Sequence, residues 1–275
     1  MNPRRALFAL LWMPANLLAI FPFPTALAQD APSSIGWRVA ALLPADVILL
    51  GEQHDIAQHQ QIHREAIEAL ALRRLLGAVA LEMAERGSST SGLAADAGEA
   101  AVQAALRWNE QAWPWTSYGP AVMAAVRAGV PVLGANLPQA AMGEAMRDIK
   151  FDMQLPGPAL KAQQQLIRLG HCGMLAEDHI TPMTRIQIAR DMAMAQTLGA
   201  AAAPGRVVLL LSGAGHADRT LGVPQHLPRE LSVKSVQLRP IDGTPPELSS
   251  AKFDAVWLAG TAPAKDYCAA FKRTS

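Results

Sequence analysis

The sequence predicts an α/β fold, in which a mostly parallel β-sheet is flanked by helices and carries a smaller helical subdomain. Three observations lead to this prediction. Short apolar runs recur along the chain, segments with helical periodicity separate them, and one long stretch, about residues 137–199, contains no strand pattern. A length of 275 residues with 51% hydrophobic residues suits one large domain with an ample core.

Six apolar runs predict the strands of the sheet. Most of them are continuously apolar rather than alternating, which is typical of parallel strands that are covered on both faces. The runs are Val47–Leu50, Ala78–Leu81, Val130–Leu133, Arg206–Leu211, Ser235–Leu238 and Phe253–Leu258.

Helical segments separate these runs. Ala57–Leu76 has apolar residues at helical spacing and two arginines in its last turn, where cations favour the helix dipole. Tyr118–Ala128 forms another helix that stops at a glycine and a proline. We expect residues 137–199 to fold into helices joined by turns, as a subdomain or lid between two strands of the sheet.

The first 28 residues are expected to form a secretory signal peptide. Arg4 and Arg5 precede an apolar stretch that ends in the small-x-small pattern of residues 26–28. Three prolines in this stretch argue against a membrane anchor. No cysteine near the cleavage site could accept a lipid, so we expect residues 29–275 to be periplasmic or secreted, and not a lipoprotein.

The charge balance and the two cysteines bound the function further. A formal net charge of +1 offers no field that would attract nucleic acid. Cys172 and Cys268 could form a disulfide in an oxidising compartment, or they could be two buried thiols. The sequence leaves both alternatives open.

Polar side chains follow four of the predicted strands. These are Glu52 and His54, then Glu82, Asn136 and His216. Because the carboxyl ends of parallel strands meet at one edge of a sheet, where ligands bind, we expect these side chains to line one pocket. A glycine ahead of the first pair is expected to allow a tight exit from the strand.

Two histidines and two carboxylates suit metal ligation, general acid–base catalysis or a structural hydrogen-bond cluster. As a hydrolase, the chain would use Glu52, His54, Glu82 and His216 to activate water, directly or through a divalent metal. The sequence contains no G-x-S-x-G motif, no P-loop and no dinucleotide-binding glycine motif after a strand.

An aromatic concentration and a histidine pair lie outside this set. Three tryptophans precede Tyr118 in the stretch RWNEQAWPWTSYGP. They form either a packed aromatic corner or a platform for a flat ligand, with the Tyr118 hydroxyl available to iron. His59 and His63 share a helix face, which we expect to be solvated, although the i,i+4 spacing could also bind a metal.

Seven short motifs occur in the order of a known family. They are LLGEQHD, ALEMAER, WPWTSYGP, GVPVLGANLP, HCGML, MTRIQIARDMAMA and LLLSGAGHADRTLGVP, and the similarity around them covers roughly Asp46 to Leu238. With these motifs the chain resembles the ChaN-like haem-binding proteins. The resemblance implies a parallel α/β core with a smaller helical region, and haem binding in bacterial iron uptake.

The resemblance also implies a ligand set and partners. Haem would be held between two subunits of a homodimer, which would work with an outer-membrane haem-uptake machinery. The family's motif residues carry over to Glu52, His54, Glu82, Tyr118, Asn136, Arg190, Asp191 and His216. Tyr118 and His216 are the expected iron ligands, with His54 as a third candidate, because phenolate and imidazole ligate haem iron. Arg190 could pair with a propionate, and Asn136 and Asp191 would complete the haem site.

Two functions therefore remain open. The resemblance favours a haem-binding protein without catalysis. The cluster of acids and imidazoles also suits a hydrolase. The wider superfamily that the chain resembles includes esterases and proteases.

Overall fold

The structure, a computed structural model, describes residues 34–242 and 251–269. The predicted signal peptide, residues 1–28, lies outside the described residues. Within the described part of the chain, no helix is long and apolar enough to span a membrane.

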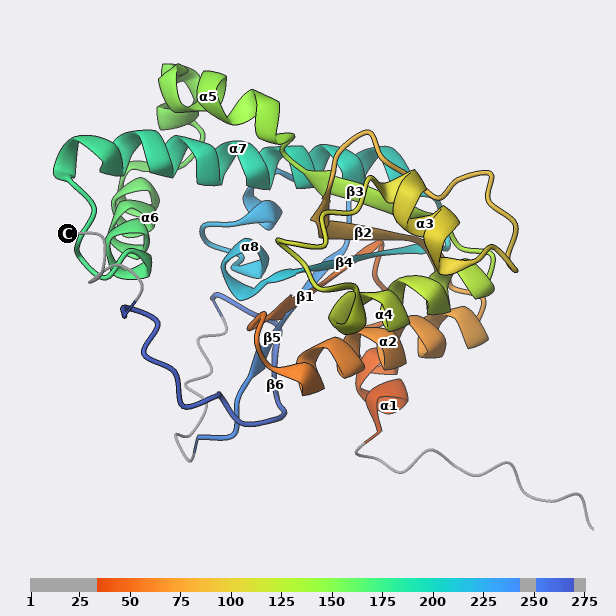
Figure 1. The fold of residues 1–275 in the computed structure, drawn as a ribbon. Helices are drawn as coiled ribbons and strands as arrows, with labels where there is room; N and C mark the ends of the chain where they lie inside the picture. Colours follow the sequence, from red (N-terminus) through yellow and green to blue (C-terminus); the bar gives the residue numbers. More distant parts are fainter. Residues whose placement is uncertain (1–33, 243–250, 270–275) are drawn as a thin grey trace, which may run out of the picture.

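The core is one six-stranded sheet in which all strands are parallel, in the order β3-β2-β4-β1-β5-β6 (Figure 1). Each predicted apolar run forms one strand, and the predicted fold class is confirmed. The strands are β1 (Val47–Glu52), β2 (Leu76–Glu85), β3 (Val132–Asn136), β4 (Val207–Gly213), β5 (Val233–Arg239) and β6 (Ala255–Leu258). Every residue of β1 and β4 is buried, as their apolar sequences require.

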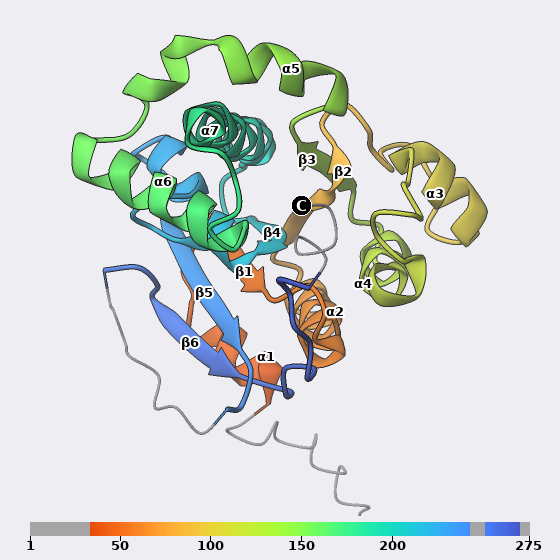
Figure 2. The same cartoon turned by 60° about the vertical axis from the view of Figure 1, so that its left-hand side comes forward.

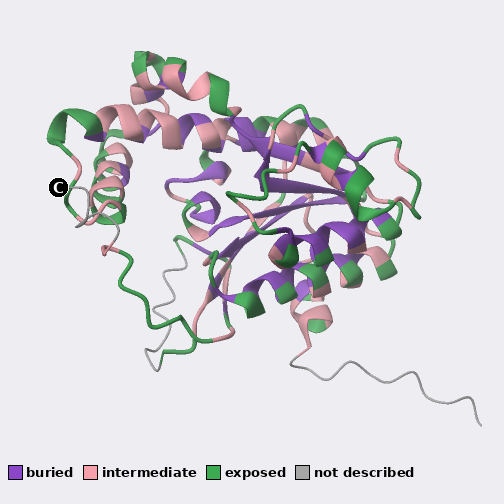
Figure 3. Cartoon of the chain, viewed as in Figure 1, coloured by how far each residue is buried: buried purple, intermediate pink, exposed green. Residues whose placement is uncertain are grey.

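Helices cover both faces of the sheet and bury its apolar side chains (Figures 1 and 3). One face packs on α1 (Ile35–Ala40), α2 (Ala57–Leu72), α3 (Glu99–Leu106) and α4 (Trp115–Arg127). The other face packs on the second half of α7 (Glu177–Ala201), on α8 (Ala214–Ala217) and on the short η2 (Val223–His226).

Between β3 and β4 the described chain is helical and forms an arm beside the sheet (Figure 2). This helical arm consists of α5 (Gln139–Arg147), η1 (Ile149–Met153), α6 (Gly157–Gly170) and the first half of α7. It has a small apolar core of its own, in which Leu137 and Phe151 pack against α7. Because α7 continues from this core onto the sheet, this helix packs the arm against the rest of the fold.

A disulfide joins Cys172, in the turn between α6 and α7, to Cys268 near the end of the described chain. Of the two alternatives that the sequence leaves open, the structure therefore has the disulfide. The bond connects segments that are 96 residues apart.

Gly51 explains why the chain has a glycine at the end of β1. A Cβ there would lie 2.7 Å from Cα of Ala214 and 2.8 Å from Cβ of Ala217, both in α8. Gly51 is needed because α8 approaches the strand closely; it is not among the described glycines with positive φ, so the expected tight exit is not the reason.

We predict that Gly51→Ala lowers the free energy of unfolding by about 1–3 kcal/mol, because overpacking displaces α8. Urea unfolding followed by circular dichroism measures this. Gly143→Ala is the matched control, since the nearest group to its Cβ is a flexible arginine end 3.8 Å away and alanine favours the helix interior. Equal unfolding midpoints for Gly51→Ala and wild type would contradict this account of Gly51.

Candidate functional site

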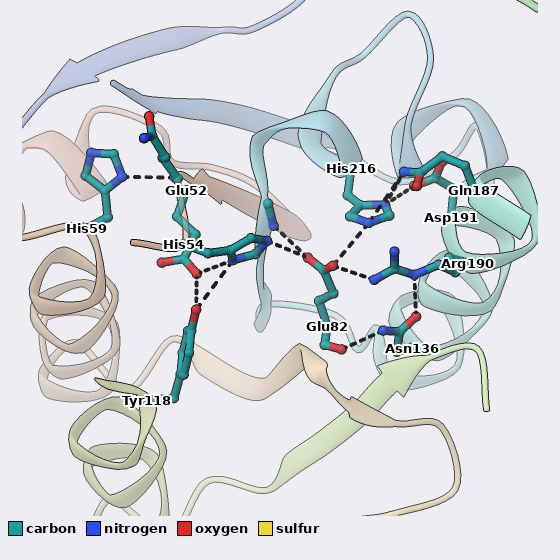
Figure 4. Close-up of polar contacts among 12 residues, drawn as sticks. Glu52, His54, His59, Glu82, Tyr118, Asn136, Gln187, Arg190, Asp191 and His216 are labelled. Atoms are coloured by element: carbon teal, nitrogen blue, oxygen red, sulfur yellow. Dashed lines mark hydrogen bonds and ion pairs between the residues drawn. The ribbon is translucent and has the colours of Figure 1, made fainter. Parts of the chain in front are cut away.

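The structure brings the predicted site residues together at the carboxyl edge of the sheet (Figure 4). They come from three strand ends, the loop after β1 and three helices. The set comprises Glu52, His54, Glu82, Tyr118, Asn136, Arg190, Asp191 and His216. The convergence predicted from the strand order is therefore present.

Glu82, near the end of β2, is the most heavily contacted of these groups. Its Oε1 lies 2.6 Å from Nη2 of Arg190 and 3.3 Å from Nε2 of His216. Its Oε2 accepts a hydrogen bond of 2.7 Å from the backbone N–H of Gly213, and Nε2 of His54 approaches to 3.8 Å. Burial raises the pKa of this carboxyl, but His216, His54 and Arg190 outweigh burial and hold the pKa well below its usual range. Glu82 is therefore a buried carboxylate.

His216 lies between two acids on the short helix α8. Its Nδ1 is 2.5 Å from Oδ1 of Asp191, and its Nε2 faces Glu82. Burial lowers the pKa of His216, but the two carboxylates raise it to about 9. Burial also raises the pKa of Asp191, although His216 opposes this. Gln187, which the sequence analysis missed, lies 3.1 Å from Nδ1 of His216.

Asn136 and Arg190 brace one another. Nε of Arg190 donates to Oδ1 of Asn136 at 2.9 Å, and Nδ2 of Asn136 donates to the backbone carbonyl of Glu82 at 2.9 Å. The Asn136 amide therefore points into the cluster rather than outward, and it positions Arg190 against Glu82.

Glu52 organises the other half of the cluster. It accepts hydrogen bonds from Tyr118 Oη at 2.8 Å, from His54 Nδ1 at 2.8 Å and from Gln60 at 2.5 Å. Burial raises the pKa of Glu52, but His63, His54 and Tyr118 outweigh it, and the pKa lies below its usual value. Burial and the carboxylate of Glu52 raise the pKa of Tyr118 far above its usual range, so the phenol keeps its proton.

His54 joins the two halves and is the most accessible member of the cluster. Its side chain is 38% exposed, whereas Glu52, Glu82, Tyr118 and His216 are buried. Burial lowers the pKa of His54, but Glu52 and Glu82 raise it above its usual value. The ring packs edge-on against Trp113 at 4.9 Å. Gly213 leaves the space for it, since a Cβ there would lie 2.9 Å from Nε2 of His54.

The aromatic stretch forms a packed corner around Tyr118. Trp113 meets the Tyr118 ring at 5.7 Å, and Trp108 meets the Trp115 ring at 5.0 Å, both edge to face. The indole N–H groups of Trp108 and Trp115 donate to the carbonyl of Trp113 and to a glutamate of α3. Of the two interpretations of this stretch, the structure shows the corner, with Trp113 beside the accessible histidine.

The prediction of a solvated helix face at His59 and His63 is wrong. Both side chains are fully buried, because this face of α2 packs beneath the loop that follows β1. Nδ1 of His59 accepts from the backbone N–H of Gln53 at 3.0 Å, and its Nε2 donates to the carbonyl of Ala259 at 3.1 Å. Burial lowers the pKa of both histidines. His63 Nδ1 lies 3.7 Å from Glu52.

The acids and imidazoles of the cluster are arranged about one another rather than about a common point. Among the residues that the structure describes, no group of three or more histidine, cysteine, aspartate or glutamate side chains is placed to hold a metal ion. The cluster is a charge-balanced network that opens to solvent mainly at His54.

Comparison with known proteins identifies the family. The family model described as "Haem-binding uptake, Tiki superfamily, ChaN" matches residues 38–227. The chain belongs to this family. The site residues from Glu52 to His216 all lie inside the matched region. No curated protein sequence matches the chain significantly.

Two solved structures are similar to the chain. ChaN of Campylobacter jejuni, described as binding haem cofacially, is 25% identical with a TM-score of 0.63, over 80% of this chain and 89% of that chain. The type III effector HopBA1 is 17% identical with a TM-score of 0.52, over 84% of this chain and 95% of that chain. The second likeness shows the fold alone.

We predict that the stabilising effect of His216 depends on pH. A folded-state pKa near 9, above the ordinary value of 6.5, means that the contribution is complete below about pH 6.5 and is lost as pH rises through about 9. The difference in the free energy of unfolding between wild type and His216→Asn should therefore be a few kcal/mol at pH 6 and shrink by pH 9. Urea unfolding at each pH measures it.

The control for this prediction is His179→Asn, which changes an exposed histidine at the start of α7. Its difference from wild type should stay small across the same pH range. A His216→Asn difference that is flat between pH 6 and 9 would contradict the placement of His216 between two carboxylates.

Proposed function

We propose that the chain is an exported haem-binding protein that takes part in bacterial iron uptake. The observation that carries this proposal is membership of the ChaN family over residues 38–227, with 25% identity to a protein described as binding haem.

His54 is the side chain that we assign to the iron. Tyr118 is buried and donates a hydrogen bond to Glu52, and both ring nitrogens of His216 face carboxylates. His54 is 38% exposed and holds Glu52 through Nδ1, while its Nε2 has the longer 3.8 Å approach to Glu82. A histidine whose second ring nitrogen binds a carboxylate is a common arrangement for a metal ligand. The bound haem would supply the iron that this imidazole ligates.

The surroundings of His54 suit a large, flat and apolar ligand. Trp113 packs against its ring. Leu169 and Met174 expose apolar surface at the tip of the helical arm, which is connected to the loop around His54 through the disulfide and the adjacent Tyr267. Apolar walls with a few polar groups are typical of cofactor sites. Arg190, braced by Asn136 and Glu82, is the cation that could meet a propionate.

Export and assembly complete the proposal. A disulfide between Cys172 and Cys268 supports an oxidising compartment such as the periplasm, in keeping with the expected signal peptide. The cofacial haem described for the Campylobacter jejuni protein supports a homodimer here, and an outer-membrane haem-uptake machinery would be its partner.

We predict that His54→Ala weakens hemin binding roughly tenfold or more and shifts the Soret band, because the iron loses its ligand. Tyr118→Phe should leave the Soret maximum in place, since the phenol serves Glu52. Absorbance titration of residues 29–275 with hemin measures both, and His179→Ala is the control for an exposed histidine. A Soret band lost in Tyr118→Phe or His216→Ala but kept in His54→Ala would contradict this ligand assignment.

A hydrolase is the second candidate, and one observation favours it. His54 is accessible, has a raised pKa and lies between the carboxylates of Glu52 and Glu82. An imidazolium and a carboxylate in contact can act as acid and base toward a bound water and a leaving group, with His216 holding Glu82 in its charged form. These distances support a hydrolase that uses His54 and a carboxylate as acid and base.

We predict for this candidate that turnover of an ester or peptide panel, tested with and without added Zn²⁺, falls at least about a hundredfold in Glu82→Gln. The reason is that the amide neither balances His216 nor accepts a proton. Wild-type protein that is inert toward the panel under both conditions would reject the hydrolase.

A further inference from the structure

The chain after β6 lies along the loop that carries His54. Residues 259–268 form this segment, which we name the strap. The carbonyl of Ala259 accepts from His59, and Gly260 lies so close to α2 that a Cβ would meet Cγ2 of Ile56 at 2.6 Å and Oε1 of Gln58 at 2.7 Å. Figure 2 shows the strap, at the blue end of the chain, passing the start of α2.

Tyr267 fastens the far end of the strap to the same loop. Its hydroxyl donates to Oδ2 of Asp55 at 2.7 Å and accepts from Nε2 of Gln53 at 3.0 Å. Gln53 and Asp55 are the two neighbours of His54 in the chain. The strap therefore holds both sides of the accessible histidine.

The next residue ties the strap to the helical arm. Cys268 forms the disulfide with Cys172, with 5.8 Å between the Cα atoms. Because Tyr267 and Cys268 are adjacent, the turn between α6 and α7 is held within a short distance of the loop around His54. The disulfide is therefore a covalent tie between the arm tip and the segment that contacts the loop around His54.

The disulfide decides how firmly this connection holds. The strap from Thr261 to Tyr267 is exposed, and the two hydrogen bonds of Tyr267 lie at the surface, where water competes for them. These two bonds join the strap to the loop around His54 and do not reach the arm tip, so reduction removes the covalent tie between the arm tip and the strap. Both cysteines are half-buried rather than enclosed, so a dithiol can reach the bond.

We propose that the strap is a redox-released clamp that limits access to His54. With the Cys172–Cys268 disulfide intact, the strap holds the arm tip against the loop that carries His54. A dithiol transfers two electrons and two protons to the disulfide and becomes a disulfide itself, which leaves two thiols and releases the arm tip from the strap. A regulation of haem exchange by this clamp rests on the proposed function. The release of the clamp on reduction does not rest on it.

The test measures the reactivity of His54 directly. Oxidised and dithiothreitol-treated full-length protein are labelled with diethyl pyrocarbonate, and mass spectrometry follows the modification of His54. We expect the labelling rate to rise several-fold on reduction. The chain contains two cysteines, so the reductant acts on this disulfide alone. An unchanged labelling rate, with reduction verified by thiol counting, would overturn the proposal.

A variant and a second readout separate the possible failures. Cys172→Ser/Cys268→Ser should label at the fast rate with or without reductant, while circular dichroism shows that it stays folded. Hemin release to apomyoglobin should accelerate in the same samples. Release that is equally fast in both redox states would overturn the regulation but leave haem binding intact. Failure to bind hemin at all would reject the proposed function, while His54 labelling still decides the clamp.

Discussion

The carboxylate of Glu82 is the group around which the site is built. A lone charge in this position would cost several kcal/mol, so the fold must bring compensating groups to it. A guanidinium from α7, an imidazole from α8 and a backbone N–H from the end of β4 supply them. Each of these contacts fixes one element relative to β2. Electrostatic as well as hydrophobic interactions therefore fix the positions of α7 and α8 at the carboxyl edge.

A second buried carboxylate, Glu52, repeats this arrangement on the neighbouring side. It is compensated by hydrogen bonds from Tyr118, Gln60 and His54. Because His54 contacts both carboxylates and alone among these groups is substantially exposed, the network presents one reactive side chain to a ligand. This arrangement explains how a cluster of eight polar residues can serve a binding function. Most of its members contact one another, and Glu52 and Glu82 also hold the imidazole of His54.

Much of this architecture follows from the sequence by simple rules. Continuous apolar runs located all six strands, and the rule that parallel strands end at one edge brought Glu52, Glu82, Asn136 and His216 together. The roles of the individual residues were harder to predict from the sequence. Periodicity alone cannot show that the loop after β1 and the end of β6 cover the face of α2 with His59 and His63. Gln60 lies outside the seven motifs and Gln187 lies within one of them, but no pattern in the sequence predicts the contacts of either side chain, which depend on packing.

The pairing of the cysteines illustrates the same limit. A separation of 96 residues says nothing about distance in space, and only the course of the chain after β6 brings Cys268 to Cys172. Likewise, the sequence favours Tyr118 and His216 as iron ligands and offers His54 as a third candidate. Their burial and hydrogen bonds distinguish them.

A crystal structure of the haem complex tests the central claim most directly. We expect the iron to be nearest to His54, with the contacts of Glu82 to Arg190, His216 and Gly213 preserved. Iron bound to Tyr118 or His216, or haem bound away from the carboxyl edge of the sheet, would contradict the account.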